Sequence, residues 1–435
     1  MKRTTKQGLI ALIAVIAIGF VVSCDDGNGT TPSGGTPTVT LTPSSVTVND
    51  DNLERTITVG GTATGAVTLT TTALPSGVTA TVDGTTITVI GVRPTTEGAP
   101  AITGNNLIVG VTRQGITQNL TVYVNLTSTW QPTGAWTSQT AAGTATNYWS
   151  SVAYGNNTYV AVGSLSSGTG LNRVMTSTNG SSWTIRNAPA GTTAHLWYSV
   201  AYGNNTFVAV GMPNSGDALT RVMTSTDNGA TWTLRNAAEA NSWTSVAYGN
   251  GMFVAVSNSG TNRVMTSTDN GASWTAHEAP GVGWWQSVTF GNGRFVAVGS
   301  NVIMTSTNGT SWTSVTSPGG NWRSVTYGNG VFVAVCDNGT NRVMTSTNGT
   351  SWTARTAAEA NQWRSVTYGG SGSSHLFVAV SSDGTNRIMT SSDGTTWRPA
   401  TAPEANSWLS VTYGNNRFVA VSGDGTYRVM TATFP

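Results

Sequence analysis

"WTSVAYGNGMFVAVS", residues 243–257, is one of seven closely similar stretches in the C-terminal part of the chain. The copies begin at Trp149, Trp197, Trp243, Trp285, Trp322, Trp363 and Trp408. The first and last of these tryptophans lie 259 residues apart, so the repeat length averages about 43 residues, which is typical of a four-stranded propeller blade. The repeat therefore predicts seven blades arranged in a ring.

Each copy divides into four short strands. In the third copy these are "WTSVAYG", "MFVAVS", "NRVMTST" and "SWTAHEA". The second strand always has alanine between two valines and an aromatic residue before them. Large residues beside small ones suit strands that are buried on both faces and interdigitate with neighbouring sheets. The alanines are Ala161, Ala209, Ala255, Ala297, Ala334, Ala379 and Ala420.

A second motif, "STDNGATW" at residues 225–232, falls between the third and fourth strands, where a hairpin is expected. Asp227 can accept backbone N–H bonds across the turn, Gly229 can adopt a positive φ, and Trp232 can pack on the blade. Three sibling copies have Asn in place of Asp. This exchange suits a turn acceptor and not a catalytic carboxylate or metal ligand. The predicted structural residues are Asp227, Gly229, Trp232, Asp269, Gly271, Trp274, Asp393 and Trp397.

This octapeptide resembles the Asp-box (BNR) motif, S-x-D-x-G-x-T-W, of sialidase and photosystem assembly-factor propellers. Over residues 130–435 the repeats also resemble the "W-x-D-V-x-F … T-x-D-G-G-x-T-W" blades of the seven-bladed photosystem II stability factor family. The resemblance implies an Asp-box β-propeller over residues 129–435. The last copy ends at "RVMTATFP" without a fourth strand, and "PTGAWTSQTA" (132–141) has the missing sequence. This N-terminal strand is predicted to close the last blade and cover its edge.

Three further segments precede the propeller. Residues 1–23, with a basic start and the apolar run "LIALIAVIAIGFVV", resemble a bacterial lipoprotein signal peptide, which implies lipidation of Cys24. Residues 24–37 have the composition of a flexible tether. Residues 38–128 alternate apolar and polar residues between turn signals, which predicts an immunoglobulin-like β-sandwich. The fold class is therefore all-β, and the lipid is expected to be the only membrane anchor.

Composition excludes some functions. Removing Lys2, Arg3 and Lys6 from the 20 basic residues leaves 17 arginines against 18 acidic residues. Such a nearly neutral chain lacks the basic face of a nucleic-acid-binding protein. The three histidines have no zinc spacing and form no nucleophile triad, so we expect no metal, no cofactor and no catalytic residue.

The residues favour a binding or scaffolding module on the bacterial envelope, at the outer membrane or cell surface, as a monomer with a glycan or an envelope protein as partner. Aromatic walls with a few polar groups are typical of ligand sites, although each Trp and Arg could instead pack between blades. A sialidase-like glycoside hydrolase, with carboxylates such as Glu239, Glu359 and Glu404, and an assembly factor for an envelope complex remain alternatives. The candidate rim residues are Trp149, Trp197, Trp243, Trp284, Trp285, Trp322, Trp363, Trp408, Arg173, Arg221, Arg263, Arg342, Arg387 and Arg428.

Overall fold

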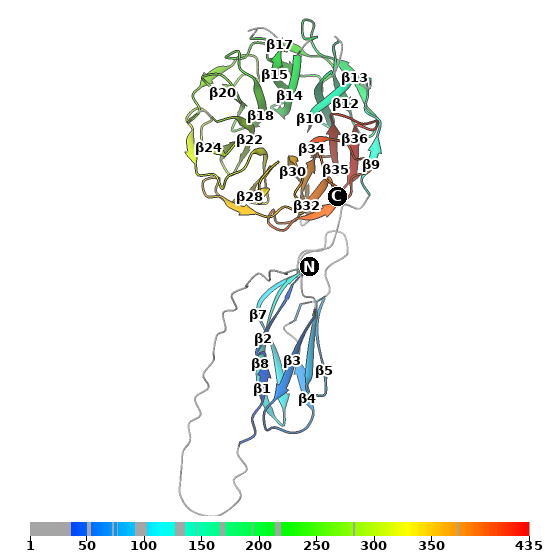
Figure 1. Ribbon diagram of the computed structural model, residues 1–435, viewed down its shortest axis with the longest axis vertical. Coiled ribbons are helices and arrows are strands. Elements are labelled where there is room, and N and C mark those ends of the chain that lie inside the picture. The colour runs from blue at the N-terminus through cyan, green and yellow to red at the C-terminus, as the bar shows by residue number, and fades with distance from the viewer. Residues whose placement is uncertain are drawn as a thin grey trace, which may run out of the picture.

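A computed structural model describes most of the chain from residue 36 to residue 434 (Figure 1). The gaps within this range are residues 50–53, 72–73, 76, 92–101, 127–134, 145, 166–169, 194, 214–218, 282 and 372–373. The predicted signal peptide, Cys24 and most of the tether lie outside the described residues. The described residues form strands, turns and bends without a helix, and so include no helix that could span a membrane.

The N-terminal part forms two four-stranded sheets around one apolar core. Alternating side chains of both sheets meet in this core, where Ile57, Ile87, Val109 and Val122 are almost completely buried. One sheet has the order β1 (Thr40–Thr42), β3 (Glu54–Gly60), β6 (Thr86–Gly91), β5 (Val78–Asp83). The other has the order β2 (Ser45–Asn49), β8 (Ile116–Leu126), β7 (Ile102–Arg113), β4 (Val67–Thr70), with β2 parallel to β8.

The repeats form seven four-stranded antiparallel sheets, here numbered 1 to 7 along the chain. Their first strands lie around the centre of a ring and their fourth strands lie at its outside (Figure 1). The first strands are β10 (Asn147–Gly155), β14 (His195–Gly203), β18 (Trp243–Gly249), β22 (Trp285–Gly291), β26 (Trp322–Gly328), β30 (Trp363–Ser371) and β34 (Trp408–Gly414). The second strands are β11 (Thr158–Leu165), β15 (Thr206–Pro213), β19 (Met252–Ser257), β23 (Arg294–Gly299), β27 (Val331–Cys336), β31 (Ser374–Ser381) and β35 (Arg417–Ser422).

The third and fourth strands complete each sheet on its outer side. The third strands are β12 (Asn172–Ser177), β16 (Val222–Ser225), β20 (Val264–Ser267), β24 (Val302–Ser306), β28 (Val343–Ser346), β32 (Ile388–Ser391) and β36 (Val429–Thr433). The fourth strands are β13 (Thr184–Asn187), β17 (Thr233–Arg235), β21 (Thr275–His277), β25 (Thr313–Val315), β29 (Thr353–Arg355), β33 (Arg398–Ala400) and β9 (Thr137–Gln139).

Strand β9 comes from the start of the ring and pairs with β36 at its end, as the repeat pattern predicts. Thr137 pairs with Thr431, and Gln139 pairs with Val429. The indole of Trp136 is almost buried and lies 6.4 Å from the ring of Phe418. This pairing gives sheet 7 its fourth strand and covers the edge of β36.

Neighbouring sheets are joined through the constant residues of the W-x-S-V stretch. The serine hydroxyl accepts a hydrogen bond of 3.1–3.2 Å from the backbone N–H of the valine in the next sheet. The series runs through all seven sheets, and the bond from Val152 to Ser410 joins sheet 1 to sheet 7. The serine is therefore constant because every copy meets the same neighbour. The accepting serines are Ser151, Ser199, Ser245, Ser287, Ser324, Ser365 and Ser410.

Candidate functional site

The seven tryptophans that begin the repeats do not line the rim. Each of them has no accessible surface. Trp197 of sheet 2, for example, packs against Val160 and Val162 of sheet 1. A buried ring cannot stack on a ligand, so of the two roles left open for these tryptophans, ligand binding and packing between blades, the structure shows packing. They are Trp149, Trp197, Trp243, Trp285, Trp322, Trp363 and Trp408.

The six arginines at or just before the start of the third strands join neighbouring sheets. Each guanidinium donates to a backbone carbonyl at the start of the next sheet. Arg342 Nη1, for example, lies 2.6 Å from the carbonyl oxygen of Asn361. We therefore correct the prediction that these side chains form a cationic rim, because their donors hold the ring together. They are Arg173, Arg221, Arg263, Arg342, Arg387 and Arg428.

Sheet 4 has Val302 at the arginine position, and the preceding residue, Asn301, contacts the next sheet instead. The φ of Asn301 is 58°, in the left-handed region that asparagine tolerates better than most residues. Its backbone N–H donates to the Gly320 carbonyl, and its side-chain oxygen accepts from the Gly320 N–H, each at 2.8 Å. The link to the next sheet is thus made by the backbone N–H and the side-chain oxygen of Asn301 together.

The Asp-box residues hold the turn between the third and fourth strands. Asp227 accepts from the Ser225 hydroxyl at 2.8 Å and from the Thr231 N–H at 2.9 Å, and Trp232 Nε1 donates to the Gly229 carbonyl. Burial favours a higher pKa for Asp227, but these hydrogen bonds lower the pKa below its ordinary value. Asp269 and Asp393 make the same kind of contacts. The corresponding Gly271, Trp274 and Trp397 occupy the same turns, with Nε1 bonds from both indoles.

The glutamates considered for glycoside hydrolysis are tied to the loops beside them. Glu239 accepts from the side chains of Asn241 and Asn262, and Glu359 accepts in the same way from Asn361 and Asn386. Glu404 accepts from the Ser138 hydroxyl of β9. The described residues contain no group of three His, Cys, Asp or Glu side chains that could hold a metal.

A pocket of about 480 Å³ lies where the seven first strands begin. Every sheet contributes to its wall the residue that directly follows the buried tryptophan. Because one residue comes from each sheet, the pocket lies on the axis of the ring. We call it the axial pocket. The seven wall residues are Ser150, Tyr198, Thr244, Gln286, Arg323, Arg364 and Leu409.

The wall residues coincide with a register shift in every first strand. The pairing skips from Trp322 to Ser324 in β26, and the other six first strands show the same irregularity. An extra, unpaired residue of this kind is a β-bulge, which turns its side chain out of the regular alternation. Because of the bulge, the residue at position x of W-x-S-V, which directly follows the buried tryptophan, does not pack between sheets and its side chain points to the axis.

The x position is also where the repeats differ most. Tryptophan, serine and valine are constant around it, whereas x is Ser, Tyr, Thr, Gln, Arg, Arg and Leu along the seven copies. This contrast between a variable x and its constant neighbours is visible in the sequence alone, but the constant residues were chosen as candidates. Each sheet would face a different part of a ligand that lies on the axis, so the residues that contact the ligand can differ from sheet to sheet. The packing residues cannot differ in this way, because each of them faces an equivalent neighbouring sheet.

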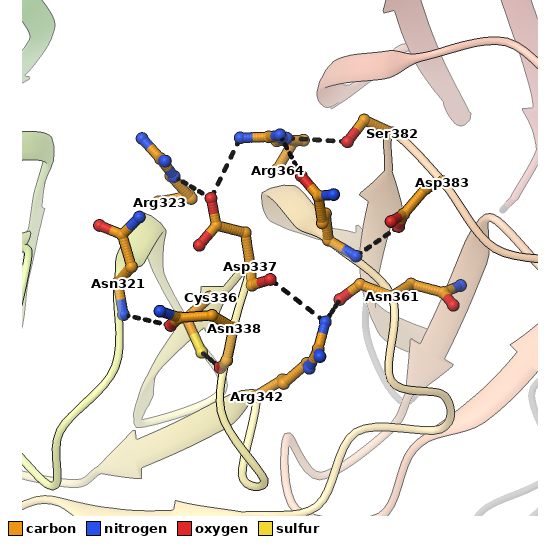
Figure 2. A network of polar contacts seen from close by, with 11 residues as sticks. Asn321, Arg323, Cys336, Asp337, Asn338, Arg342, Asn361, Arg364, Ser382 and Asp383 are labelled. Atoms are coloured by element: carbon orange, nitrogen blue, oxygen red, sulfur yellow. Dashed lines mark hydrogen bonds and ion pairs between the residues drawn. The ribbon is translucent and has the colours of Figure 1, made fainter.

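One side of the axial pocket carries positive charge (Figure 2). Asp337, at the end of β27, receives Arg323 Nε at 2.6 Å and Arg364 Nη1 at 3.2 Å. Arg364 is also held by the Ser382 hydroxyl at 2.9 Å and by the Gln362 side chain at 2.6 Å. The two guanidiniums and one carboxylate leave a net charge of one positive unit.

The other side of the pocket is apolar and aromatic. Tyr148, Leu196, Tyr198 and Leu409 of sheets 1, 2 and 7 lie in its wall. Burial raises the pKa of the phenols of Tyr148 and Tyr198, so both stay neutral donors at ordinary pH. The described lining residues include neither histidine nor cysteine. The arrangement offers recognition groups and no pair of carboxylates for hydrolysis.

The large apolar side chains exposed on the ring lie in segments at this same end. Trp284 directly precedes β22 and is 64% exposed. Tyr148 is the second residue of β10, and Leu219 and Tyr427 lie in the loops between second and third strands. Trp284 thus differs from the buried Trp285 beside it and stays a candidate for ligand contact. Exposed aromatic residues around a pocket are typical of an interaction surface.

Comparison with known proteins places the fold. A solved structure described as YCF48 bound to D1 peptide matches with a TM-score of 0.53 and 14% identity, over 70% of this chain and 98% of that one. A catalytically inactive virginiamycin B lyase from Staphylococcus aureus, with quinupristin, matches with a TM-score of 0.57 and 13% identity, over 69% and 99%. The ring is a β-propeller. No protein-family model matches the chain, and no curated protein does.

Proposed function

We propose that this chain is a non-catalytic binding module whose axial pocket holds a segment of a protein partner. The observation that carries the proposal is the variable x position, because seven side chains of six kinds converge on one pocket within the constant W-x-S-V framework. Variation at the pocket wall beside constant packing residues is what selective recognition by a ring of repeats requires.

Two further observations support a peptide as ligand. The solved YCF48 structure, similar in fold, is described as bound to a peptide. In this chain, exposed Trp284, Leu219 and Tyr427 lie at the same end of the ring as the pocket, whose wall includes Tyr148, and they would contact a protein beyond the bound segment. A glycan is the other ligand class that the wall could take, and an assembly factor for an envelope complex is the cellular role that fits a peptide-binding propeller.

We also propose the finer architecture and the cellular location. The ring would be a seven-bladed propeller of the Asp-box type, and the two N-terminal sheets would be an immunoglobulin-like spacer. The lipid on Cys24 would hold the monomeric chain at the outer membrane or cell surface. A signal peptide, tether and spacer in this order would carry the pocket away from the membrane.

The anchor is testable through Cys24. We expect the chain to label with fatty acid and to partition into detergent, and Cys24→Ser should abolish both, because the lipid would be attached through the Cys24 thiol. Metabolic labelling with phase separation checks this. Recovery of the natural chain from the medium with an unmodified N-terminus would contradict the anchor while leaving the pocket untouched.

The pocket is testable by filling it. Ser150→Trp places a large ring on the axis, so we expect ligand capture on peptide and glycan arrays to fall at least tenfold, because a ligand cannot share the filled volume. Ser314→Trp on the outer strand β25 is the matched control. Equal binding by both variants, with melting temperatures like that of the natural chain, would place the binding site elsewhere.

A further inference from the structure

We propose that the axial pocket binds a carboxylate next to an apolar side chain, as in a peptide that ends in an apolar residue or carries an acidic residue beside one. The inference rests on the proposed function, because it assigns the ligand of the same pocket. Its carrying observation is that Arg323 and Arg364 line the same pocket as apolar and aromatic side chains. The apolar and aromatic residues are Tyr148, Leu196, Tyr198 and Leu409, and uncharged polar residues complete the wall.

The cationic side has donors left for a ligand. Among the described residues, Arg323 donates only through Nε, to Asp337, so both terminal nitrogens are available. Figure 2 shows the end of Arg323 pointing away from Asp337. Its side chain is 28% exposed. A guanidinium with two free terminal donors suits the two oxygens of a carboxylate, which it can bind side by side.

Asp337 sets the charge of the ligand. Its carboxylate lies between Arg323 and Arg364 and cancels one of their two charges. A ligand with a single negative charge would neutralise the remaining unit, whereas a phosphate ester with about two charges would meet the Asp337 oxygens at close range. A carboxylate therefore fits the site better than a phosphate group does.

The apolar side distinguishes a peptide from a glycan. Leu196 and Leu409 present branched aliphatic groups, and Tyr148 and Tyr198 present rings with neutral hydroxyls. Aliphatic walls match a leucine, valine or phenylalanine side chain through burial of apolar surface. A sugar hydroxyl that faces Leu196 and Leu409 finds no hydrogen-bond partner in those two side chains, which is unfavourable, whereas an apolar side chain needs none.

The two sides are close enough for one short ligand. Tyr148 and Arg364 line the same pocket of about 480 Å³. Burial raises the pKa of the Tyr148 phenol, the positive charge of Arg364 lowers it and the negative charge of Asp424 raises it. Adjacent groups of one peptide, a carboxylate and its own or the neighbouring side chain, can contact both sides together.

The test uses the full chain and immobilised pentapeptides. One series ends in Leu, Phe or Ser with a free carboxylate, a second series is the same but amidated, and a third is amidated with an internal Asp beside Leu, Phe or Ser. Sialylated and neutral glycans are printed beside them. We expect binding to the first or third series, with Leu and Phe above Ser, and at least tenfold weaker binding to the uncharged second series.

The variants take their residues from sibling repeats, so that each new side chain already occupies the same bulge elsewhere. Arg323→Gln copies Gln286 and Tyr198→Thr copies Thr244. We expect Arg323→Gln to lower affinity for carboxylate peptides about tenfold or more and to remove its salt dependence. Tyr198→Thr should remove the preference for Leu and Phe over Ser. Arg355→Gln on the outer strand β29 is the control.

Each outcome separates the inference from the proposed function. Binding to the free-carboxylate series assigns a chain end, and binding to the third series assigns an acidic side chain; either supports the inference. A different result would be capture of amidated neutral peptides or of glycans. If Ser150→Trp abolished this capture and Arg323→Gln did not, the inference of a carboxylate ligand would be wrong, but binding in the axial pocket would still be supported. Capture insensitive to all pocket variants would overturn the proposed function itself.

Discussion

Replacing Trp322 by alanine should lower the free energy of unfolding by about 3–5 kcal/mol, the usual cost of truncating a fully buried tryptophan. Its indole has no accessible surface and packs in one cluster with Val296, Val298 and Ile303 of the preceding sheet. Its Nε1 also donates to the Ser317 hydroxyl at 3.1 Å. Thermal and denaturant unfolding of the full chain measure the loss.

Trp284→Ala provides the control for this substitution. Trp284 is 64% exposed and stands outside the repeat pattern, so the stability change should stay within about 0.5 kcal/mol, as for most surface substitutions. A similar loss for the two variants would mean that the constant tryptophans do not carry the packing between sheets.

Replacing residues 135–141 by an equally long Gly/Ser sequence should destabilise the ring by at least about 3 kcal/mol. The change removes the pairing of β9 with β36 and the packing of Trp136 against Phe418. It also leaves the β36 edge uncovered, and uncovered edges promote association between chains. We therefore expect a lower melting temperature together with oligomers in size-exclusion chromatography.

The same replacement within the predicted tether, at residues 25–31, controls for the altered composition. It should change neither the melting temperature nor the elution volume, because a segment with the composition predicted for a tether is expected to contribute little to stability. A ring that melts at the natural temperature without the β9 sequence would show that sheet 7 needs no fourth strand.

The repeat made the architecture predictable from the sequence. Constant residues at a spacing of about 43 give the sheets, and the missing last strand points to residues 132–141. The same constancy misled the choice of site. Because each copy in a ring meets an equivalent neighbour, residues such as Trp322 and Arg342 are constant for packing, and constancy therefore does not identify a binding residue in a repeat protein.

The charged side of the pocket depends on contacts that no short sequence pattern contains. Arg323 meets Asp337 because β26 and β27 pair Trp322 with Cys336, which brings residues 14 positions apart together. Arg364 joins them from the neighbouring sheet. The bulge that directs Arg323 to the axis has no signature in a single repeat either. The divergence of the x position is the one sequence signal that could have located the pocket.

Photocrosslinking from the pocket wall tests the central claim most directly. A benzophenone amino acid replaces Gln286 in the wall of the axial pocket or, in a second full-length chain, Ser314 on the outer strand β25. After binding of the best peptide from the arrays, irradiation should join the peptide to the chain with the probe at position 286, and Ser150→Trp should suppress this product. Crosslinks that form from position 314 and not from position 286 would contradict binding on the axis.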